Sequence, residues 1–566
     1  MSRITRHFLP LPGGGQIHYR RAGSGPPLIL MHPSPNSSAM VVPMIEAMAN
    51  DFTCIAIDTP GYGISDDVVT DDTTQLYGYA VALEKILTAL GIGACAIYGA
   101  ATGAQIAVKF ALMNPQRVPL LILDSIGDFS DEMDHVLDGY FQDIAPMRDG
   151  SHLMRVWDMC RHLSVAFPWQ STRGADRLDN DVAPPEAINK YVVDYLRAGP
   201  NYAKAYRPAV EVERWDITTR VTVPTLLAHN RSSGVIKHVD ALIGKGLPAN
   251  FTVVPCDAAT RTARLRDAAV ARRPNVSPPP PPPHQTGTAD GYQNMHVAVT
   301  NAGRAGDIRL RVNLTGKGRP LIGIHDPAGS SALIEPFLAS FIGTRPVIAI
   351  DLPGNGESDN IIDATAITTS AYAVVVNATV AALGLDAVDV FGRYSGGQVG
   401  MEMAFQAPSV VKHVIQSPFM IFESDEQKWL LANYTPSIAP RWDGSHLMTA
   451  WRFMYDQSLY WPWFDATRRG IIKNHPPVDI ARTHLRVVEL LKIGDQYQKA
   501  YAALWTYPMR ERLPKLPVPT LIGASAWEPT AAKTPLAAVI APGVTTATLP
   551  DQIPAWRPIF DAFLGT

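Results

Sequence analysis

The chain has 566 residues, and at about 100–200 residues per domain this length predicts three or four domains, or two large ones. It carries 49 basic and 52 acidic residues, so its net charge of −3 gives no overall field that favours nucleic acid or an anionic membrane. The 48 prolines exceed the usual share of about 5%, which predicts that part of them form a linker.

The four cysteines lie far apart and lack a CxxC spacing, so we expect buried free thiols in a reducing compartment. The first residues contain no apolar stretch typical of a secretion signal, and no run of about 18 apolar residues predicts a membrane span. No glycine-rich phosphate motif, metal-ligand cluster or basic stripe stands out either. We therefore expect a soluble cytoplasmic protein without a cofactor that binds neither nucleic acid nor membrane.

In chain order, short β-branched runs alternate with amphipathic stretches, and a long helical insertion interrupts the pattern before a further strand. In the first half we expect strands at 53–57, 94–98 and 118–123, a helix at 77–90 and an insertion at about 129–219. In the second half we expect strands at 347–350 and 388–391, a helix at 371–383 and an insertion at about 421–514. Such alternation is typical of a mostly parallel sheet with helices on both faces.

Between the halves, residues 271–290 read ARRPNVSPPPPPPHQTGTAD and contain little that could join a core. The six prolines from Pro278 to Pro283 predict polyproline II, which at about 3.1 Å per residue spans roughly 19 Å. We interpret the segment as a stiff linker; a ligand for an SH3-type domain is the alternative, but no basic residue flanks a PxxP core.

The two halves are copies of one another. LILMHPSPNSS at 28–38 matches LIGIHDPAGSS at 321–331, and IAPMRDGSHLM at 144–154 matches IAPRWDGSHLM at 438–448. The offset between matching residues stays between 293 and 295. We therefore predict two domains, at 1–270 and 291–566, joined by the linker.

Both halves resemble the α/β-hydrolase superfamily over nearly their full length. The resemblance rests on a His-containing loop after a strand, on DTPGYGISD at 58–66 and DLPGNGESD at 351–359, on a glycine-rich elbow, on the helical insertion, and on a PVPTL strand. It implies two tandem α/β domains, each with a helical cap over a strand-turn-helix elbow that presents a nucleophile beside an oxyanion hole.

The elbow departs from the Gly-x-Ser-x-Gly pattern of the family. Residues 99–103 read GAATG and residues 392–396 read GRYSG, which places Ala101 and Tyr394 at the nucleophile position. Ser395 is an alternative nucleophile in a shifted register, and its backbone N–H is a candidate oxyanion donor.

The other members of a triad are also incomplete. Glu528, after the PVPTL strand of the second half, fits the position of the acid, whereas the first half reads AHNRSSG there. The family's base is a His near the end of the domain, but the last His of the chain is His484 and residues 256–273 contain none. Neither half can then assemble a Ser-His-Asp triad from its usual positions, and we expect the first half to be inactive.

Each cap contains an Asp-Gly-Ser-His-Leu-Met string, with His152 in the first copy and His446 in the second, and Trp451 follows the second string. The simplest interpretation is a helix start in which Asp443 caps the helix and His446 is a satisfied helix residue. The alternative is that His446 descends toward Tyr394 and replaces the missing base, with Trp451 in the pocket.

The loop after the third strand offers further pocket residues. His325 and Asp326, with His32 as the first copy's counterpart, stand where the resemblance places oxyanion-hole elements. Asp326 is a candidate to face the pocket, and bracing of the loop is the simpler role for His325. Eight of the eleven tryptophans follow the linker, which indicates either cap packing or an aromatic pocket for a flat ligand.

Two functions of different class follow. The first is a divergent enzyme in which Tyr394, His446 and Glu528 act on a small hydrophobic carbonyl compound by hydrolysis or by a lyase or cyclisation step, without a triad. The second is a pseudoenzyme, a ligand-binding or structural protein whose two domains pair with each other as a fused pseudo-dimer.

Overall fold

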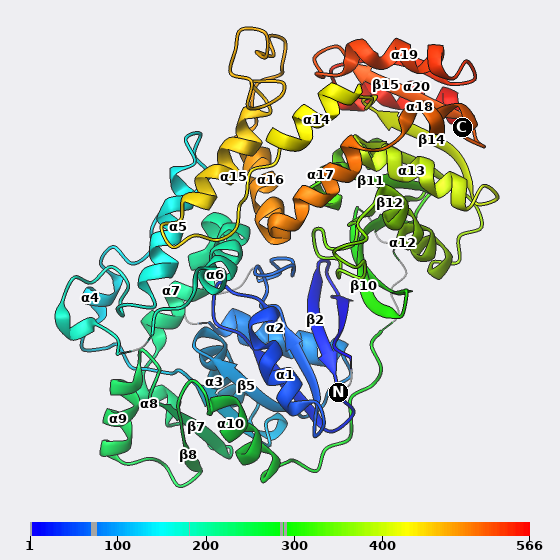
Figure 1. Ribbon diagram of the computed structural model, residues 1–566. Coiled ribbons are helices and arrows are strands. Elements are labelled where there is room, and N and C mark those ends of the chain that lie inside the picture. Colours follow the sequence, from blue (N-terminus) through cyan, green and yellow to red (C-terminus); the bar gives the residue numbers. More distant parts are fainter. Residues whose placement is uncertain (1–2, 70–75, 180, 284–286, 288–290, 566) are drawn as a thin grey trace. The chain divides into compact units, whose positions relative to one another are not determined.

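The computed structural model describes residues 3–69, 76–179, 181–283, 287 and 291–565. The chain divides into two compact units, residues 1–285 and 286–566, which are described separately below (Figure 1). Part of the predicted linker, residues 284–286 and 288–290, lies outside the described residues.

Each unit contains an eight-stranded sheet with the same strand order. The first sheet runs β1-β2-β4-β3-β5-β6-β7-β8, and the second runs β9-β10-β12-β11-β13-β14-β15-β16. In each sheet the second strand, β2 or β10, pairs antiparallel with both of its neighbours, and all other strand pairs are parallel. The strands are β1 (Thr5–Pro10), β2 (Gln16–Ala22), β3 (Pro27–Met31), β4 (Thr53–Ile57), β5 (Ala96–Ala100), β6 (Leu121–Asp124), β7 (Thr225–Asn230), β8 (Phe251–Cys256), β9 (Gln293–Asn301), β10 (Arg304–Asn313), β11 (Leu321–Ile324), β12 (Val347–Ile350), β13 (Val388–Arg393), β14 (Val411–Ser417), β15 (Thr520–Ser525) and β16 (Thr545–Leu549).

The central strands are apolar throughout because both of their faces are covered. In β3, Ile29 and Met31 join the hydrophobic cluster on one face, and Leu28 and Leu30 join the cluster on the other. This alternation follows from the two-residue repeat of a strand. It explains why the sequence shows continuous apolar runs instead of alternating ones.

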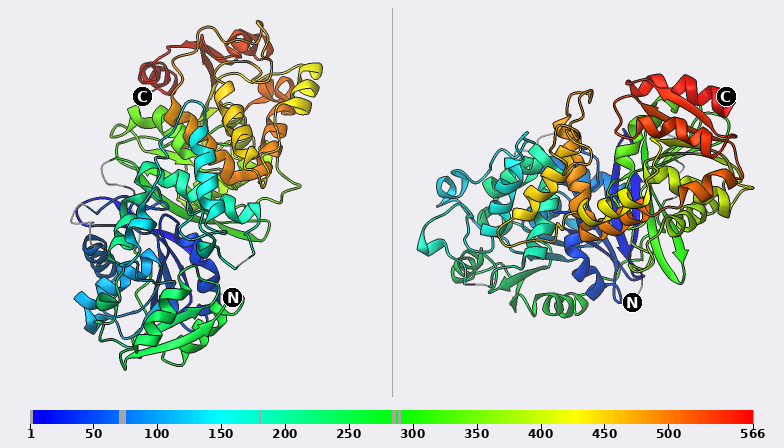
Figure 2. Two further views of the ribbon diagram at one scale, coloured as in Figure 1. Left: turned by 90° about the vertical axis from the view of Figure 1, so that its left-hand side faces the viewer. Right: turned by 45° about the horizontal axis from the view of Figure 1, so that its top comes forward.

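Helices cover both faces of each sheet, as the views of Figures 1 and 2 show. In the first unit these are α1 (Val42–Met48), α2 (Tyr77–Ala89), α3 (Thr102–Met113), α9 (Ile236–Lys245) and α10 (Arg261–Val270). In the second unit they are α11 (Ser331–Leu338), α12 (Thr369–Ala382), α13 (Ser395–Gln406), α19 (Thr534–Ile540) and α20 (Arg557–Leu564).

The two insertions form helical caps. The first contains α4 (Met133–Leu137), α5 (Ser151–His162), α6 (Pro185–Ala198), α7 (Ala203–Val212) and α8 (Trp215–Thr218). The second contains α14 (Ser424–Asn433), α15 (Ser445–Asp456), α16 (Ile480–Ile493), α17 (Tyr497–Trp505) and α18 (Met509–Arg512). The copies agree in side-chain detail, since Trp169 Nε1 donates to Tyr140 O (3.0 Å) and Trp463 Nε1 donates to Tyr434 O (2.7 Å).

The proline tract lies against the first unit. Arg21 on β2 donates from Nη1 to Pro280 O (2.5 Å) and from Nη2 to Pro279 O (3.2 Å). A polyproline II chain makes no internal hydrogen bonds, so its carbonyls are available to such donors. Pro279 and Pro280 are therefore held by Arg21, so part of the expected stiff linker is anchored to the first unit.

All four cysteines are buried and none is in a disulfide. Burial raises the pKa of the Cys54 and Cys95 thiols to about 12, so these groups stay protonated at neutral pH. Among the described residues, no helix has the length and apolarity needed to cross a membrane.

Candidate active site

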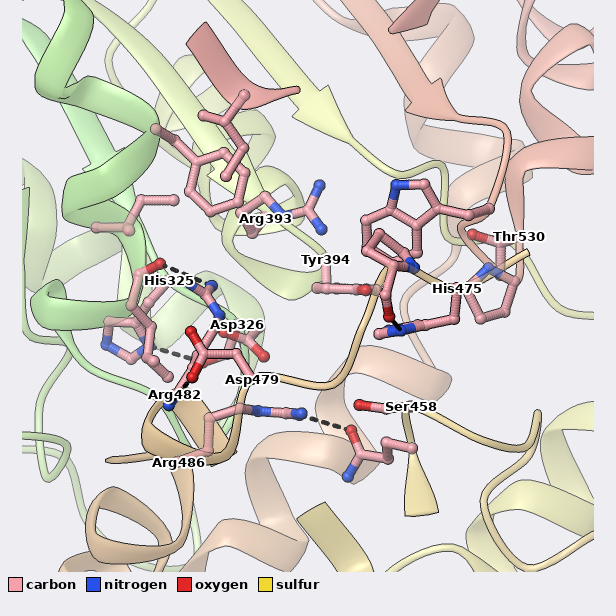
Figure 3. Close-up of a pocket in the computed structure, with 18 of the residues that line it drawn as sticks. His325, Asp326, Arg393, Tyr394, Ser458, His475, Asp479, Arg482, Arg486 and Thr530 are labelled. Carbon is pink, nitrogen blue, oxygen red and sulfur yellow. Dashed lines mark hydrogen bonds between the residues drawn. The ribbon is translucent and has the colours of Figure 1, made fainter. Parts of the chain in front are cut away.

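A cavity of about 510 Å³ lies in the second unit, between the carboxyl ends of the sheet strands and the cap. Its wall combines charged residues with a large aromatic surface (Figure 3). The charged side chains and histidines that line it are His325, Asp326, Arg393, His475, Asp479, Arg482, Arg486 and Asp551. The aromatic side chains are Phe337, Tyr394, Tyr434, Trp461, Tyr501, Trp505, Trp527 and Trp556.

Tyr394 occupies the elbow between β13 and α13. Its backbone φ of 47° and ψ of −115° match those of Ala101, 48° and −117°, at the same turn of the first unit. A β-carbon added to Gly392 would lie 2.1 Å from the carbonyl carbon of Gly396, so the strand and the helix meet only because both positions are glycine. The positive φ identifies Tyr394 and Ala101 as the residues at the nucleophile position, and not Ser395.

The Tyr394 side chain lines the cavity and is only partly buried. Among the described residues, none forms a hydrogen bond with its hydroxyl. Burial raises the pKa of Tyr394, and the nearby Arg393 guanidinium offsets part of this rise. The phenol therefore stays protonated near neutral pH and can donate a hydrogen bond into the cavity.

Arg393 and Glu528 form a buried ion pair beneath Tyr394. Arg393 Nη2 lies 2.5 Å from Glu528 Oε1, and the two side chains are 8% and 0% exposed. Glu528 Oε2 also accepts from the Ser525 N–H (2.8 Å), and Arg393 Nη1 donates to Ser417 Oγ (2.8 Å). In the position predicted for the acid, Glu528 thus pairs with a permanent cation, and the coulombic attraction of Glu528 raises the pKa of Arg393.

Asp326 lines the cavity, and no hydrogen bond or ion pair to its carboxylate is found in the described part of the chain. His325 beside it braces the loop: its Nε2 accepts from the Leu352 N–H (3.0 Å) and its Nδ1 donates to Asp326 O (2.6 Å). His32 makes the same two contacts, with Thr59 N–H (2.9 Å) and Pro33 O (2.8 Å).

The structure corrects the prediction that His446 faces Tyr394. His446 Nδ1 accepts from the Arg441 N–H (3.1 Å), and His152 accepts from the Met147 N–H at the same distance in the first unit. Asp443 closes the same turn by accepting from the Ser445 N–H (3.0 Å). Burial lowers the pKa of His446 to about 4, so its imidazole is neutral, and His446 is absent from the cavity wall. The Asp-Gly-Ser-His string therefore builds a helix start.

Two further predicted pocket residues lie elsewhere. Trp451 is fully buried in the cap, where its ring stacks on Tyr455 with centroids 6.1 Å apart. Ser395 is buried at the start of α13 and borders a separate hollow of about 10 Å³. Neither contributes to the wall of the large cavity, because the elbow and the rotation of α15 turn both away from it.

Sequence reasoning missed the cap residues that do reach the cavity. Arg482 and Arg486 lie one helical turn apart on α16, and His475 precedes that helix (Figure 3). His475 Nδ1 bonds to Pro476 O (2.6 Å), and its ring packs edge-on against Trp527 at 5.1 Å. The i, i+4 spacing of the two arginines was one available signal, and their absence from the first copy was another.

The loop after β16 supplies Asp551 and Gln552 to the wall, at the end of the domain where the base of a triad is expected. This part of the wall contains no histidine. In the first unit, Ala101 offers no reactive group. In place of a hydroxyl with a paired base, the cavity thus offers the Tyr394 phenol at the elbow, the Asp326 carboxylate and three guanidinium groups.

The strand order, the strained elbow and the helical cap define a protein of the α/β-hydrolase class. The profile of the family described as "alpha/beta hydrolase fold" matches residues 26–258 and 323–433, which is more than half of the chain. The chain therefore belongs to the α/β-hydrolase fold family, as the resemblance of its motifs predicted.

The curated relatives include hydrolases. The soluble epoxide hydrolase of Corynebacterium sp. (strain C12) is 35% identical over 129 residues, which cover 22% of this chain and 44% of that enzyme. The 2-hydroxy-6-oxononadienedioate/2-hydroxy-6-oxononatrienedioate hydrolase of Burkholderia vietnamiensis (strain G4 / LMG 22486) is 36% identical over 114 residues, or 19% and 39% of the two chains. The chain thus spans less than half the length of these relatives. Among solved structures, an esterase from Thermogutta terrifontis matches 48% of this chain and 96% of its own, with 20% identity and a TM-score of 0.37.

Proposed function

We propose that the second domain is an enzyme that acts on a small, hydrophobic carbonyl compound by acid/base chemistry without a Ser-His-Asp triad. The observation that carries this proposal is that Tyr394 and Asp326 line one cavity and that neither side chain has a hydrogen-bonding partner among the described residues. A proton donor and a proton acceptor that are both unoccupied are available to a substrate.

The two groups have complementary roles. Tyr394, kept protonated by its raised pKa, donates a hydrogen bond or its proton to the carbonyl oxygen of the substrate. The Asp326 carboxylate accepts a proton, either from the carbon next to that carbonyl or from an attacking water. In the first case the products are an enol, a protonated Asp326 and a tyrosinate, and the return of both protons regenerates the enzyme.

The Arg393–Glu528 pair supports this step without transferring a proton. The centre of the Arg393 guanidinium lies 4.9 Å from the centroid of the Tyr394 ring. Its positive charge stabilises the negative charge that develops on the phenol oxygen, and Glu528 fixes its position. Arginine remains protonated in proteins, so Arg393 cannot replace the histidine base of a triad.

The relatives named above as hydrolases favour hydrolysis as the overall reaction. Lyase and cyclisation steps need the same two proton transfers, and they stay in the proposal as alternatives. The first domain is proposed to be inactive, because Ala100, Ala101 and Pro33 stand where the second domain has Arg393, Tyr394 and Asp326.

The test uses the full chain with phenylacetone and phenyl acetate as probes. Proton NMR in D₂O follows deuterium exchange beside the ketone carbonyl, and absorbance follows release of phenol from the ester. General acid/base catalysis contributes about 10²–10⁴-fold, so Tyr394→Phe and Asp326→Asn should each lower the rate at least 100-fold. Undiminished rates in both variants would overturn the proposal.

A binding protein is the second candidate, and one observation favours it: Tyr394 has no base beside its hydroxyl in the described residues. On this account the cavity holds a ligand and leaves it unchanged. Saturable stabilisation of the protein by phenylacetone, with no exchange and no turnover of either probe, would favour the binding protein over the enzyme.

A further inference from the structure

We infer that Arg482 and Arg486 form a carboxylate-binding subsite in this cavity, and that its ligand is an aromatic compound carrying a carboxylate group. The inference deepens the function proposed above, on which it rests for the choice of cavity. It concerns binding, however, and can be tested apart from any reaction.

The first support is the hydrogen bonding of the two guanidinium groups. Arg482 Nη2 donates to Leu333 O (3.3 Å), and Arg486 donates to Gln457 Oε1 (2.7 Å) and Met454 O (3.4 Å). All three acceptors are uncharged, and no carboxylate of the described residues forms an ion pair with either arginine. A guanidinium has five N–H donors in a planar fork, so most of the donors of both groups are unoccupied.

The second support is the balance of charge inside the cavity. Three guanidinium groups line it, and Glu528 neutralises that of Arg393. Asp326 lines the cavity as well (Figure 3), so Glu528 and Asp326 together balance two of the three positive charges.

The remaining acidic residues of the wall do not supply that charge. Asp479 and Asp551 are exposed to solvent, and Asp479 caps α16 by accepting from the backbone N–H of Arg482 (3.0 Å). Burial, and then the nearby Arg486, lower the pKa of Arg482, and Asp326 offsets part of this change. Arg482 and Arg486 carry like charges one helical turn apart, which is unfavourable. An anionic ligand between them would remove the repulsion.

The third support is the comparison of the two copies within the chain. Helices α6 and α16 each have 14 residues and end before Gly199 and Gly494. At the positions of Arg482 and Arg486, the first copy has Ala187 and Tyr191. Helix formation at this place in the cap therefore does not require arginine. The pair of cations is specific to the copy that has the cavity described above.

The aromatic wall defines the rest of the ligand. Phe337, Trp461, Tyr501, Trp505, Trp527 and Trp556 all contribute to it. Such a wall favours a flat, apolar body, and the two arginines on one side favour a planar anion at its end. A bidentate carboxylate fits the guanidinium fork better than a single point charge does.

The experiment measures binding to the full chain by isothermal titration calorimetry. Phenylpyruvate is the anionic probe, and phenylacetone is its neutral counterpart with the same ring and ketone. We expect phenylpyruvate to bind at least 10-fold more tightly. Arg482→Met and Arg486→Met should each weaken phenylpyruvate about 10-fold or more and change phenylacetone less than 2-fold, because charge-assisted hydrogen bonds are lost.

Two controls make the result specific. Arg469→Gln removes an exposed cap arginine outside the cavity wall and should leave both affinities unchanged. Arg486→Lys retains a positive charge and should keep part of the preference for the acid. The inference would be overturned if the two probes bound with equal affinity, or if the Met variants lost affinity for both probes equally. It would also be overturned if phenylpyruvate showed no saturable binding at millimolar concentration.

Failure of this inference and failure of the proposed enzyme are distinguishable. Tyr394→Phe and Asp326→Asn should abolish turnover and still bind phenylpyruvate. If no variant affects a reaction but the arginines determine binding of the acid, the subsite stands and the enzyme does not. If turnover depends on Tyr394 while the two probes bind with equal affinity, the enzyme stands and the subsite does not.

Discussion

The ion pair between Arg393 and Glu528 is the most buried charged feature of the cavity, and its removal gives a sharp prediction. We expect Glu528→Gln to preserve the shape of the side chain and to leave the Arg393 guanidinium without a counterion. The Arg393 and Glu528 side chains are 8% and 0% exposed, so water cannot replace the lost charge. Deleting one partner of such a pair costs about 3–5 kcal/mol in the free energy of unfolding.

The assay is urea unfolding followed by tryptophan fluorescence, which reports mainly on the second domain because eight of the eleven tryptophans follow the linker. The matched control is Glu423→Gln, which breaks the pair with Arg510, whose side chains are 69% and 51% exposed. That change should cost less than about 1 kcal/mol. The double variant Arg393→Met/Glu528→Leu should recover most of the stability, since no buried charge remains. If Glu528→Gln lowered the free energy of unfolding by less than about 1 kcal/mol, as expected for the exposed control Glu423→Gln, the reasoning would be refuted.

Three further predictions concern other residues. Burial raises the pKa of Glu213 to about 8, so the folded first domain holds a proton that the unfolded chain releases near pH 4.5. The stability of this domain relative to the Glu213→Gln variant should then fall by about 3.5 kcal/mol from pH 5 to pH 8, and parallel profiles in urea titrations would contradict this. His446→Ala deletes the acceptor of the Arg441 N–H and should lower the free energy of unfolding by about 1–3 kcal/mol. The affinity for phenylpyruvate, measured by calorimetry, should stay unchanged. A loss of affinity at unchanged stability would show instead that His446 contributes to ligand binding in the cavity. Ala101→Ser should give no esterase activity above the wild-type level in the phenyl acetate assay, because a serine without a base is not activated, and a measurable gain would show that the first domain retains a base.

The fold could be predicted from the sequence because its signals are local and repeated. The strands at Thr53–Ile57 and Val347–Ile350 begin and end where the apolar runs do. The strand expected at 94–98 instead runs from Ala96 to Ala100, directly into the elbow. The periodicity shows that a strand is buried on both faces, but its ends depend on where the next turn begins.

The candidate site was predicted only in part. Tyr394 followed from the elbow, whose glycines fix the register. Which cap side chains reach the cavity depends on the rotation of each helix, and sequence spacing alone does not give that rotation. His446 drew attention because its motif is distinctive. The same string occurs in the first copy, which has Ala101 in place of Tyr394, and this was the sign of a structural role. Arg482 and Arg486 differ between the copies, and that difference was the better guide to the site.

The central claim is that Tyr394 transfers or shares a proton with a bound carbonyl compound. The most direct test is the rate of deuterium exchange beside the carbonyl of phenylacetone, measured by NMR for the wild type and for Tyr394→Phe at equal ligand occupancy. The account predicts exchange in the wild type and a rate at least 100-fold lower in the variant. Equal rates in the two proteins would contradict it.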